Sequence, residues 1–170
     1  ICAGNVMVEQ FSHGQSNPTF RIRCGCGRSD HDGPSATMFV LRKQPPGTLL
    51  KSAHNVAREA AVMTALATTA VPVASVVCVC RDKSVIGTEF YVMEYVDGTV
   101  HLDPVKDTQT LGIQNRTKVF EEMMKTLAAL HTVDVSSVGL ATYIPPSKPG
   151  VTPSSYARRQ LTRWRTQFEA

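Results

Sequence analysis

A carboxylate interrupts the apolar side of the helix that we expect over residues 52–67, "SAHNVAREAAVMTALA", with Ser52 as its cap. The apolar stripe of this helix consists of Val56, Ala60, Met63 and Leu66. Glu59 lies three residues after the first of these positions and four before the third, so the helical period places its side chain on the same stripe. Because a buried charge is costly unless it is paired, we expect a cation on the element that this helix packs against. The alternative is that Glu59 lies at the rim of the helix and is solvated.

Two cations end the strand that we expect over residues 37–43, "TMFVLRK", and either could pair with Glu59. Side chains alternate along a strand, so only one of the two cations can share a face with Val40. That cation is Arg42, which precedes Glu59 by 17 residues. Lys43 takes its place if the register slips by one residue.

A third polar group lies between two further expected strands, at residues 5–11 and 19–25. The tip of this hairpin consists of Ser12, His13, Gly14, Gln15, Ser16 and Asn17. None of these residues has a large apolar side chain, and Gly14 lets the backbone approach another group closely. The hairpin tip therefore has a large hydrogen-bonding capacity, although an ordinary polar turn is the simpler interpretation.

A sheet followed by helices must position these groups. Two more strands are expected over residues 71–80 and 89–96, and two more helices over 114–134 and 155–170. Apolar residues at positions 119, 123, 127 and 130 share one face of the first of these helices. Strands gather early in the chain and helices late, which is typical of an α+β fold and not of a doubly wound sheet. We therefore predict a five-stranded antiparallel sheet with the helix at 52–67 packed on one face.

The composition argues against several classes of protein. A net charge of +4 without a long Lys/Arg block gives no footprint for nucleic acid. No apolar run approaches the roughly 20 residues that span a membrane. The five cysteines are an odd number without the density of a disulfide scaffold, which favours a reducing, intracellular compartment. We expect the cytoplasm, with mitochondria and peroxisomes as alternatives.

Four of the cysteines form two C-x-C pairs, Cys24 with Cys26 and Cys78 with Cys80. Four thiolates could bind zinc, but zinc ligands from one segment are usually spaced C-x-x-C. The second pair also lies inside an expected strand, where residues two apart share a face and suit packing. We interpret these cysteines as structural thiols and predict no metal site in these residues.

Six segments, in order and spanning nearly the whole chain, resemble those of one family. They are "QFSHGQSNPTF", "FVLRKQPPG", "AREAAVM", "VPVASVVCVCRD", "IGTEFYVMEYVDG" and "LAALHTVD". The chain resembles the N-terminal lobe of the protein-kinase-like fold, in the branch of the aminoglycoside phosphotransferases and choline kinases. Within that branch it is most similar to the kinase-like domain fused to some acyl-CoA dehydrogenases. The resemblance implies a nucleotide-binding N lobe at residues 1–98, and the hinge exit and first helices of an incomplete C lobe at 99–170.

The resemblance also implies roles for the polar groups. The hairpin tip would lie over the ATP phosphates, with its backbone N–H groups and small side chains as donors. Arg42 takes the place of the strand lysine of protein kinases and would make charged, forked contacts to phosphate, while Glu59 would hold this cation in place. Two features depart from protein kinases, because the tip has one glycine instead of G-x-G-x-x-G and arginine replaces lysine.

The adenine contacts follow from the same resemblance. The segment "MEYVDG" matches the hinge between lobes, so Met93 would stand beside the adenine and Val40 beneath it. The carbonyl of Glu94 and the amide of Val96 would pair with the adenine edge, and Tyr95 lies between them.

The implied activity is phosphoryl transfer from ATP, with magnesium, to a small-molecule hydroxyl. Acyl-CoA dehydrogenase-linked relatives imply hydroxyacyl-CoA substrates and a fusion to or association with such a dehydrogenase; aminoglycosides and choline are the alternative substrates. The family's catalytic base and magnesium ligands lie in H-G-D…N and I-D-W-E segments, and neither segment occurs in this chain. We expect them beyond Ala170, so these residues contain no catalytic residue and should be inactive alone. A catalytically inactive nucleotide-binding or scaffold module is the alternative.

Overall fold

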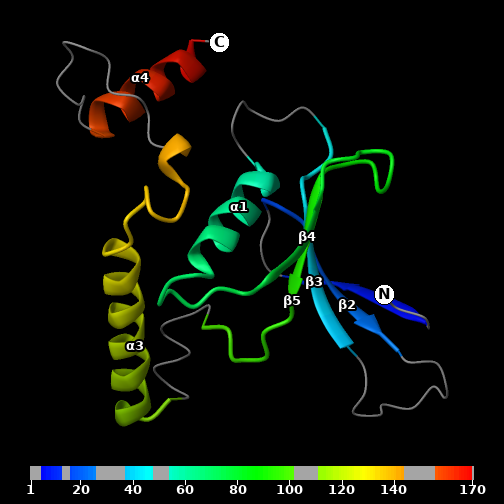
Figure 1. Ribbon diagram of the computed structural model, residues 1–170, viewed down its shortest axis with the longest axis horizontal. Helices are drawn as coiled ribbons and strands as arrows, with labels where there is room; N and C mark the ends of the chain where they lie inside the picture. The colour runs from blue at the N-terminus through cyan, green and yellow to red at the C-terminus, as the bar shows by residue number, and fades with distance from the viewer. Residues whose placement is uncertain are drawn as a thin grey trace.

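The computed structural model describes residues 5–12, 16–25, 37–47, 54–101, 111–143 and 156–169. The strands are β1 (Val6–Gln10), β2 (Thr19–Cys24), β3 (Thr37–Lys43), β4 (Val76–Cys80) and β5 (Phe90–Glu94). The helices are α1 (Val56–Leu66), α3 (Ile113–His131) and α4 (Tyr156–Phe168), with a short 3-10 helix, η1, at Ala141–Tyr143. Figure 1 shows α1 against the sheet, with α3 and α4 on the far side of α1.

The strands form a single antiparallel sheet in the order β1-β2-β3-β5-β4. This arrangement confirms the predicted α+β class and the predicted five-stranded antiparallel sheet. The strand predicted over 37–43 has those bounds, whereas β4 begins at Val76 and not at residue 71. Val71 is buried without belonging to a strand, and Pro72 has no backbone N–H for a ladder. The predicted strand is therefore right from Val76 onward and wrong for residues 71–75.

The two faces of the sheet differ in what covers them. In the pairing of β3 with β5, Val40 lies opposite Met93 and Arg42 opposite Tyr91, and these residues share the face toward α1. The core on that face consists of Val56, Ala60 and Tyr91, with Met63, Val76 and Met93 packed around it. Alternation directs Phe39, Phe90 and Cys78 to the other face.

The start of α1 differs from the prediction in a way that matters for the site. The helix begins at Val56, four residues later than expected, because the side chain of Asn55 caps it and accepts a hydrogen bond from the Arg58 backbone N–H at 2.8 Å. His54, which was expected inside the helix, has φ 55°, a left-handed conformation that is incompatible with a right-handed helix. The expected cap region around Ser52 lies outside the described residues.

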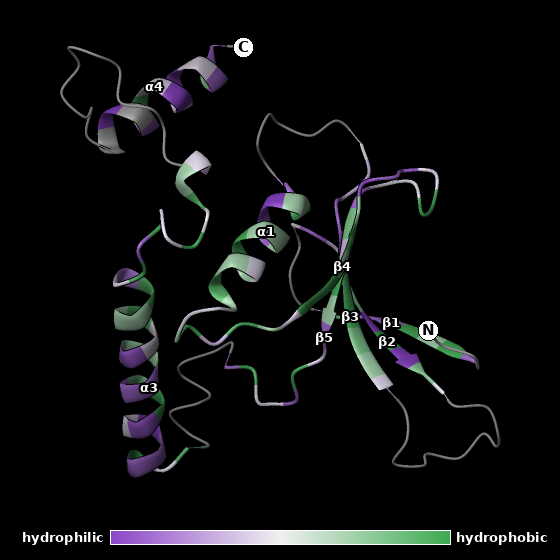
Figure 2. Ribbon diagram, in the orientation of Figure 1, coloured by the Kyte–Doolittle hydropathy of each residue, from purple (hydrophilic) through white to green (hydrophobic). Residues whose placement is uncertain are grey.

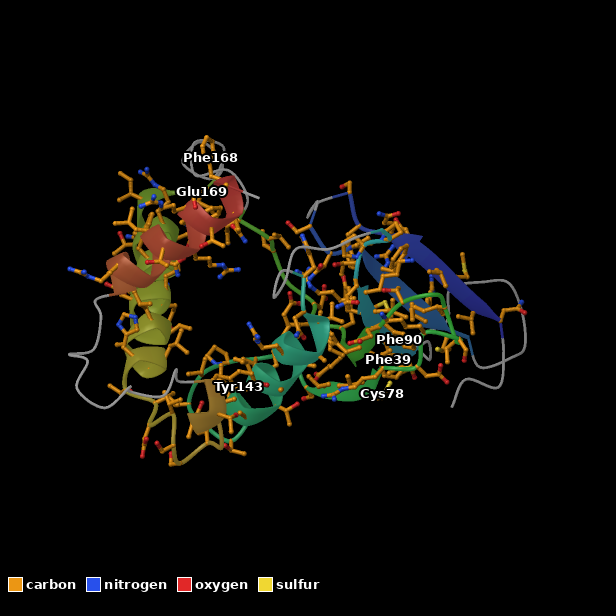
Figure 3. The ribbon with its side chains drawn as sticks, turned by 90° about the horizontal axis from the view of Figure 1, so that it is seen from above. Phe39, Cys78, Phe90, Tyr143, Phe168 and Glu169 are labelled. Carbon is orange, nitrogen blue, oxygen red and sulfur yellow. The ribbon has the colours of Figure 1, made fainter. Side chains whose placement is uncertain are left out.

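The helices after the sheet are more exposed than α1. None of the residues of α3 is buried, although its predicted apolar face exists, with Met123 53% and Leu130 43% exposed. Figure 2 shows hydrophobic residues along α1 and the central strands, whereas α3 is largely hydrophilic toward the viewer. Tyr143 of η1 lies beside α1 (Figure 3), with its ring centre 5.7 Å from Cζ of Arg58. Within the described part of the chain, no helix is both long and apolar enough to cross a membrane.

Candidate functional site

The pairing expected from the helix pattern is present. Glu59 of α1 accepts a hydrogen bond from Arg42 of β3, with 2.8 Å between Arg42 Nε and Glu59 Oε2. Both side chains are partly buried, 29% exposed for Arg42 and 35% for Glu59. Lys43 points to the opposite face, where its ammonium lies 5.9 Å from the ring centre of Phe20. The expected pairing of Glu59 with a cation at the end of this strand is therefore confirmed, and of the two candidates the partner is Arg42.

Two residues on neighbouring strands complete the surroundings of this ion pair. Thr19 lies opposite Arg42 in the pairing of β2 with β3, and its Oγ1 accepts from Arg42 Nη1 at 3.1 Å. Tyr91 lies opposite Arg42 on β5, and its hydroxyl is 3.5 Å from Glu59 Oε2. The guanidinium is thus anchored through Nε and Nη1, and the described residues offer no hydrogen-bond partner to Nη2.

The hydroxyl of Tyr91 stays protonated in this site. Its side chain is 2% exposed. Burial raises the pKa of Tyr91 to about 12, with a further increase from the negative charge of Glu59 and an opposing decrease from Arg42. Tyr91 therefore acts as a neutral donor, and its hydroxyl also lies 3.8 Å from the sulfur of Met63.

The hairpin tip reaches α1 through Asn17, which is only 2% exposed. Its Nδ2 donates to Glu59 Oε1 at 2.8 Å, and its Oδ1 lies 3.1 Å from His54 Nδ1. The sequence suggested Asn17 as one of the donors to phosphate, but both ends of its amide are engaged by side chains from other segments. Ser12 and Ser16, at the two described ends of the tip, are exposed, whereas residues 13–15 (His13, Gly14 and Gln15) lie outside the described residues.

The residues expected around the adenine lie near one end of β5. Val40 is 7% exposed and faces Met93 across the strand pair. The backbone N–H of Glu94 donates to the carbonyl of Ser75 at 2.9 Å, which leaves the expected adenine contact of this residue to its carbonyl. Tyr95 is half-buried, and Val96, beyond the end of the strand, is 64% exposed. The adenine roles of these residues remain predictions.

Three residues of the site were missed by the sequence reasoning. Thr19 and Tyr91 follow from the strand register, because each is directly opposite Arg42. His54 was hidden by the wrong helix start, which placed it on a helical turn. Asn55 was the signal that could have corrected this error, because asparagine is among the strongest N-cap residues and it precedes the apolar stripe directly.

One of the described cysteines has a different state from the one expected. Cys24, buried at the end of β2, is disulfide-bonded, so the prediction of a free thiol is wrong for this residue. Cys78 and Cys80 of β4 are free, the former exposed and the latter half-buried. Cys26 lies outside the described residues. Within the described ranges no three His, Cys, Asp or Glu side chains are grouped so that they could hold a metal ion.

An antiparallel sheet of five strands, covered by one helix whose glutamate holds a cation of the third strand, defines the N-terminal lobe of the protein-kinase-like fold. The sequence assigns the chain to one family within this fold. Residues 7–169 match the phosphotransferase enzyme family (APH), and the chain belongs to this family.

Known proteins of two kinds resemble the chain. The crystal structure of a "putative aminoglycoside phosphotransferase" from Ralstonia eutropha is 39% identical with a TM-score of 0.67, and the match covers 98% of this chain and 42% of that one. "Probable acyl-CoA dehydrogenase IBR3" of Arabidopsis thaliana is 43% identical over 96% of this chain and 18% of its own length. Mouse "Acyl-CoA dehydrogenase family member 11" is 39% identical over 96% of this chain and 18% of its own length. The chain thus spans less than a fifth of these curated relatives.

Proposed function

We propose that these residues are the nucleotide-binding part of an ATP-dependent phosphotransferase that acts on a small-molecule hydroxyl. The observation that carries this proposal is the anchoring of the Arg42 guanidinium by Glu59 at 2.8 Å and by Thr19 at 3.1 Å. A cation fixed on two sides, with Nη2 still able to donate, is suited to hold a phosphate oxygen without reorganisation. Family membership supports the phosphotransferase class.

The remaining parts of the site fit an extended nucleotide triphosphate. The hairpin tip would cover the phosphates through its backbone N–H groups and the exposed hydroxyls of Ser12 and Ser16. Val40 and Met93 would contact the adenine, and the carbonyl of Glu94 and the N–H of Val96 would pair with its edge. In this arrangement the chain binds and orients ATP, and Arg42 offsets negative charge on its phosphates.

The reaction would move the γ-phosphoryl group from ATP to a hydroxyl oxygen of the substrate, leaving ADP, while the hydroxyl proton passes to a base. Magnesium would neutralise phosphate charge during transfer. The base and the magnesium ligands would come from a part of the protein outside these residues, since the chain covers 42% of the aminoglycoside phosphotransferase-like structure. Residues 1–170 alone would accordingly transfer no phosphate.

The names of the relatives guide the choice of substrate. Because they are named acyl-CoA dehydrogenases, a link between this kinase-like region and such a dehydrogenase in one polypeptide is the arrangement we propose. A hydroxyacyl-CoA is then the first substrate to test, with an aminoglycoside and choline as the alternatives.

The test uses the complete protein encoded by the gene. It is incubated with Mg-ATP and each of the three hydroxyl substrates, and both ADP and the phosphorylated product are measured by mass spectrometry. We expect product with one substrate class and none without ATP. ATP binding without any product would favour an inactive nucleotide-binding module, and the absence of ATP binding would contradict the proposal.

A further inference from the structure

Asn17 belongs to the polar hairpin tip but is among the most buried polar residues of the described chain. It is 2% exposed, whereas Ser12 and Ser16 of the same tip are exposed. Burial of an amide is unfavourable unless its donor and acceptor are both satisfied. Here both are, by Glu59 at 2.8 Å and by His54 at 3.1 Å.

The chemistry of the partners fixes the direction of each hydrogen bond. An ionised carboxylate only accepts, so the Asn17 atom that faces Glu59 is the donor Nδ2. The carbonyl oxygen Oδ1 therefore faces His54, and the bond forms when His54 Nδ1 carries a proton. The result is a directed series in which His54 donates to Asn17 and Asn17 donates to Glu59.

Glu59 is the point where this series meets the cation. Its Oε1 accepts from Asn17, and its Oε2 accepts from Arg42 at 2.8 Å. Thr19 strengthens the same junction, since its hydroxyl donates to the carbonyl of Asn17 at 3.0 Å and accepts from Arg42. One carboxylate thus fixes both the end of the hairpin tip and the guanidinium on β3.

We propose that Asn17 is a positioning residue that links the hairpin tip to Arg42 through Glu59, with His54 setting the orientation of its amide. This inference rests on the proposed function, because the linked parts are those expected to hold the ATP phosphates. It replaces the simpler role of Asn17 as a direct donor to phosphate.

The first experiment measures Mg-ATP affinity by calorimetry in the complete protein and in Asn17→Ala and Asn17→Asp. The alanine variant should bind ATP about tenfold more weakly, since the tip loses its charged anchor. The aspartate variant is isosteric but sets a carboxylate against Glu59 in place of a donor. Two carboxylates in contact hold one proton well above the usual pKa of a carboxyl group, and that proton restores the hydrogen bond.

Asn17→Asp should therefore recover affinity relative to the parent as the pH falls from about 8 to about 5, while Asn17→Ala should not. Glu59 and His54 face the new carboxylate directly, and Arg42 and Tyr91 face Glu59. When binding is measured at a temperature where every variant is folded, a residue that only stabilised the fold would give no pH-dependent recovery.

A matched pair of variants tests His54. Its φ of 55° is tolerated by asparagine and glycine, so both substitutions preserve the backbone. Asparagine places an amide donor close to the position of Nδ1, whereas glycine provides none. His54→Asn should bind ATP severalfold more tightly than His54→Gly.

The outcomes separate this inference from the proposed function. If the parent binds no ATP, the proposed function fails and the link with it. If the parent binds ATP but Asn17→Ala binds equally well, or Asn17→Asp shows no recovery and the two His54 variants bind alike, the link is wrong and the nucleotide site stands. Should Asn17→Ala fail to fold, the aspartate and His54 variants still decide between these results.

Discussion

Replacing Glu59 with glutamine tests how strongly the site depends on one carboxylate. Glutamine preserves the shape but offers one acceptor oxygen and one NH2 group, where the carboxylate accepts from Asn17 on one oxygen and from Arg42 on the other. Whichever way the amide turns, one of these donors faces another donor. The variant also leaves Arg42 without a compensating negative charge.

The size of the effect follows from the burial of the pair. A hydrogen bond to a charged group contributes about 1.5–3 kcal/mol, and a fully buried ion pair loses about 3–5 kcal/mol when one partner is removed. Arg42 and Glu59 are 29% and 35% exposed, so solvent screens part of that loss. We expect Glu59→Gln to lower the free energy of unfolding by about 2 kcal/mol.

Glu9 provides the matched control. It forms an ion pair with Arg21 between β1 and β2, and the two side chains are 70% and 39% exposed. Glu9→Gln makes the same chemical change at the surface and should cost much less, because solvent screens this exposed pair. Urea unfolding of the complete protein, followed by fluorescence and circular dichroism, measures both variants. Equal losses for Glu59→Gln and Glu9→Gln would refute the view that Glu59 is the junction of the site.

Three further predictions concern the surroundings of the site. The raised pKa of Tyr91 means that the folded protein keeps this proton between about pH 10 and 12, where the unfolded chain has lost it. The free energy of unfolding should therefore fall across that range by at most about 1.4 kcal/mol per pH unit. Tyr91→Phe should lack this component, and an identical slope in both proteins would contradict the assignment. Asn55→Ala should lower the free energy of unfolding, measured in urea, by about 1 kcal/mol, whereas Asn55→Asp keeps the capping oxygen and should lower it much less. Similar losses in both variants would show that the cap is not the reason α1 begins at Val56. Gly87 has φ 82°, so Gly87→Ala should lower the free energy of unfolding by about 1–2 kcal/mol. Gly98 has no positive φ, so Gly98→Ala should have no such effect. An unchanged stability of Gly87→Ala would contradict the argument from backbone strain.

The ion pair of Arg42 and Glu59 was accessible from the sequence because two simple periods locate it. The period of two along β3 separates Arg42 from Lys43, and the helical period places Glu59 on the apolar stripe of α1. Both periods hold wherever the strand or helix is regular, and they show which side chains share a face. Because a partly buried charge needs a partner, the contact between Arg42 and Glu59 then follows.

The role of Asn17 was not accessible in the same way. A polar residue at a hairpin tip is expected to be exposed. The burial of Asn17 depends on its contact with α1, and no local sequence pattern predicts that contact. His54 was lost through a boundary error, because the predicted cap is Ser52, whereas Asn55 caps the helix in the structure. The start of β4 at Val76 was missed for a similar reason, since an apolar run does not show how its residues are hydrogen-bonded.

Titration of Mg-ATP into the complete protein, compared with Arg42→Ala and Lys43→Ala, tests the central claim most directly. Each variant removes one positive charge from the end of β3, but only Arg42 is held by Glu59, while Lys43 lies over Phe20 on the opposite face. Measured at a temperature where all three proteins are folded, Arg42→Ala should weaken ATP binding about ten- to a hundredfold, as expected for one charged contact, and Lys43→Ala should bind like the parent. Weakened binding in Lys43→Ala with parental binding in Arg42→Ala, or parental binding in both, would contradict the account.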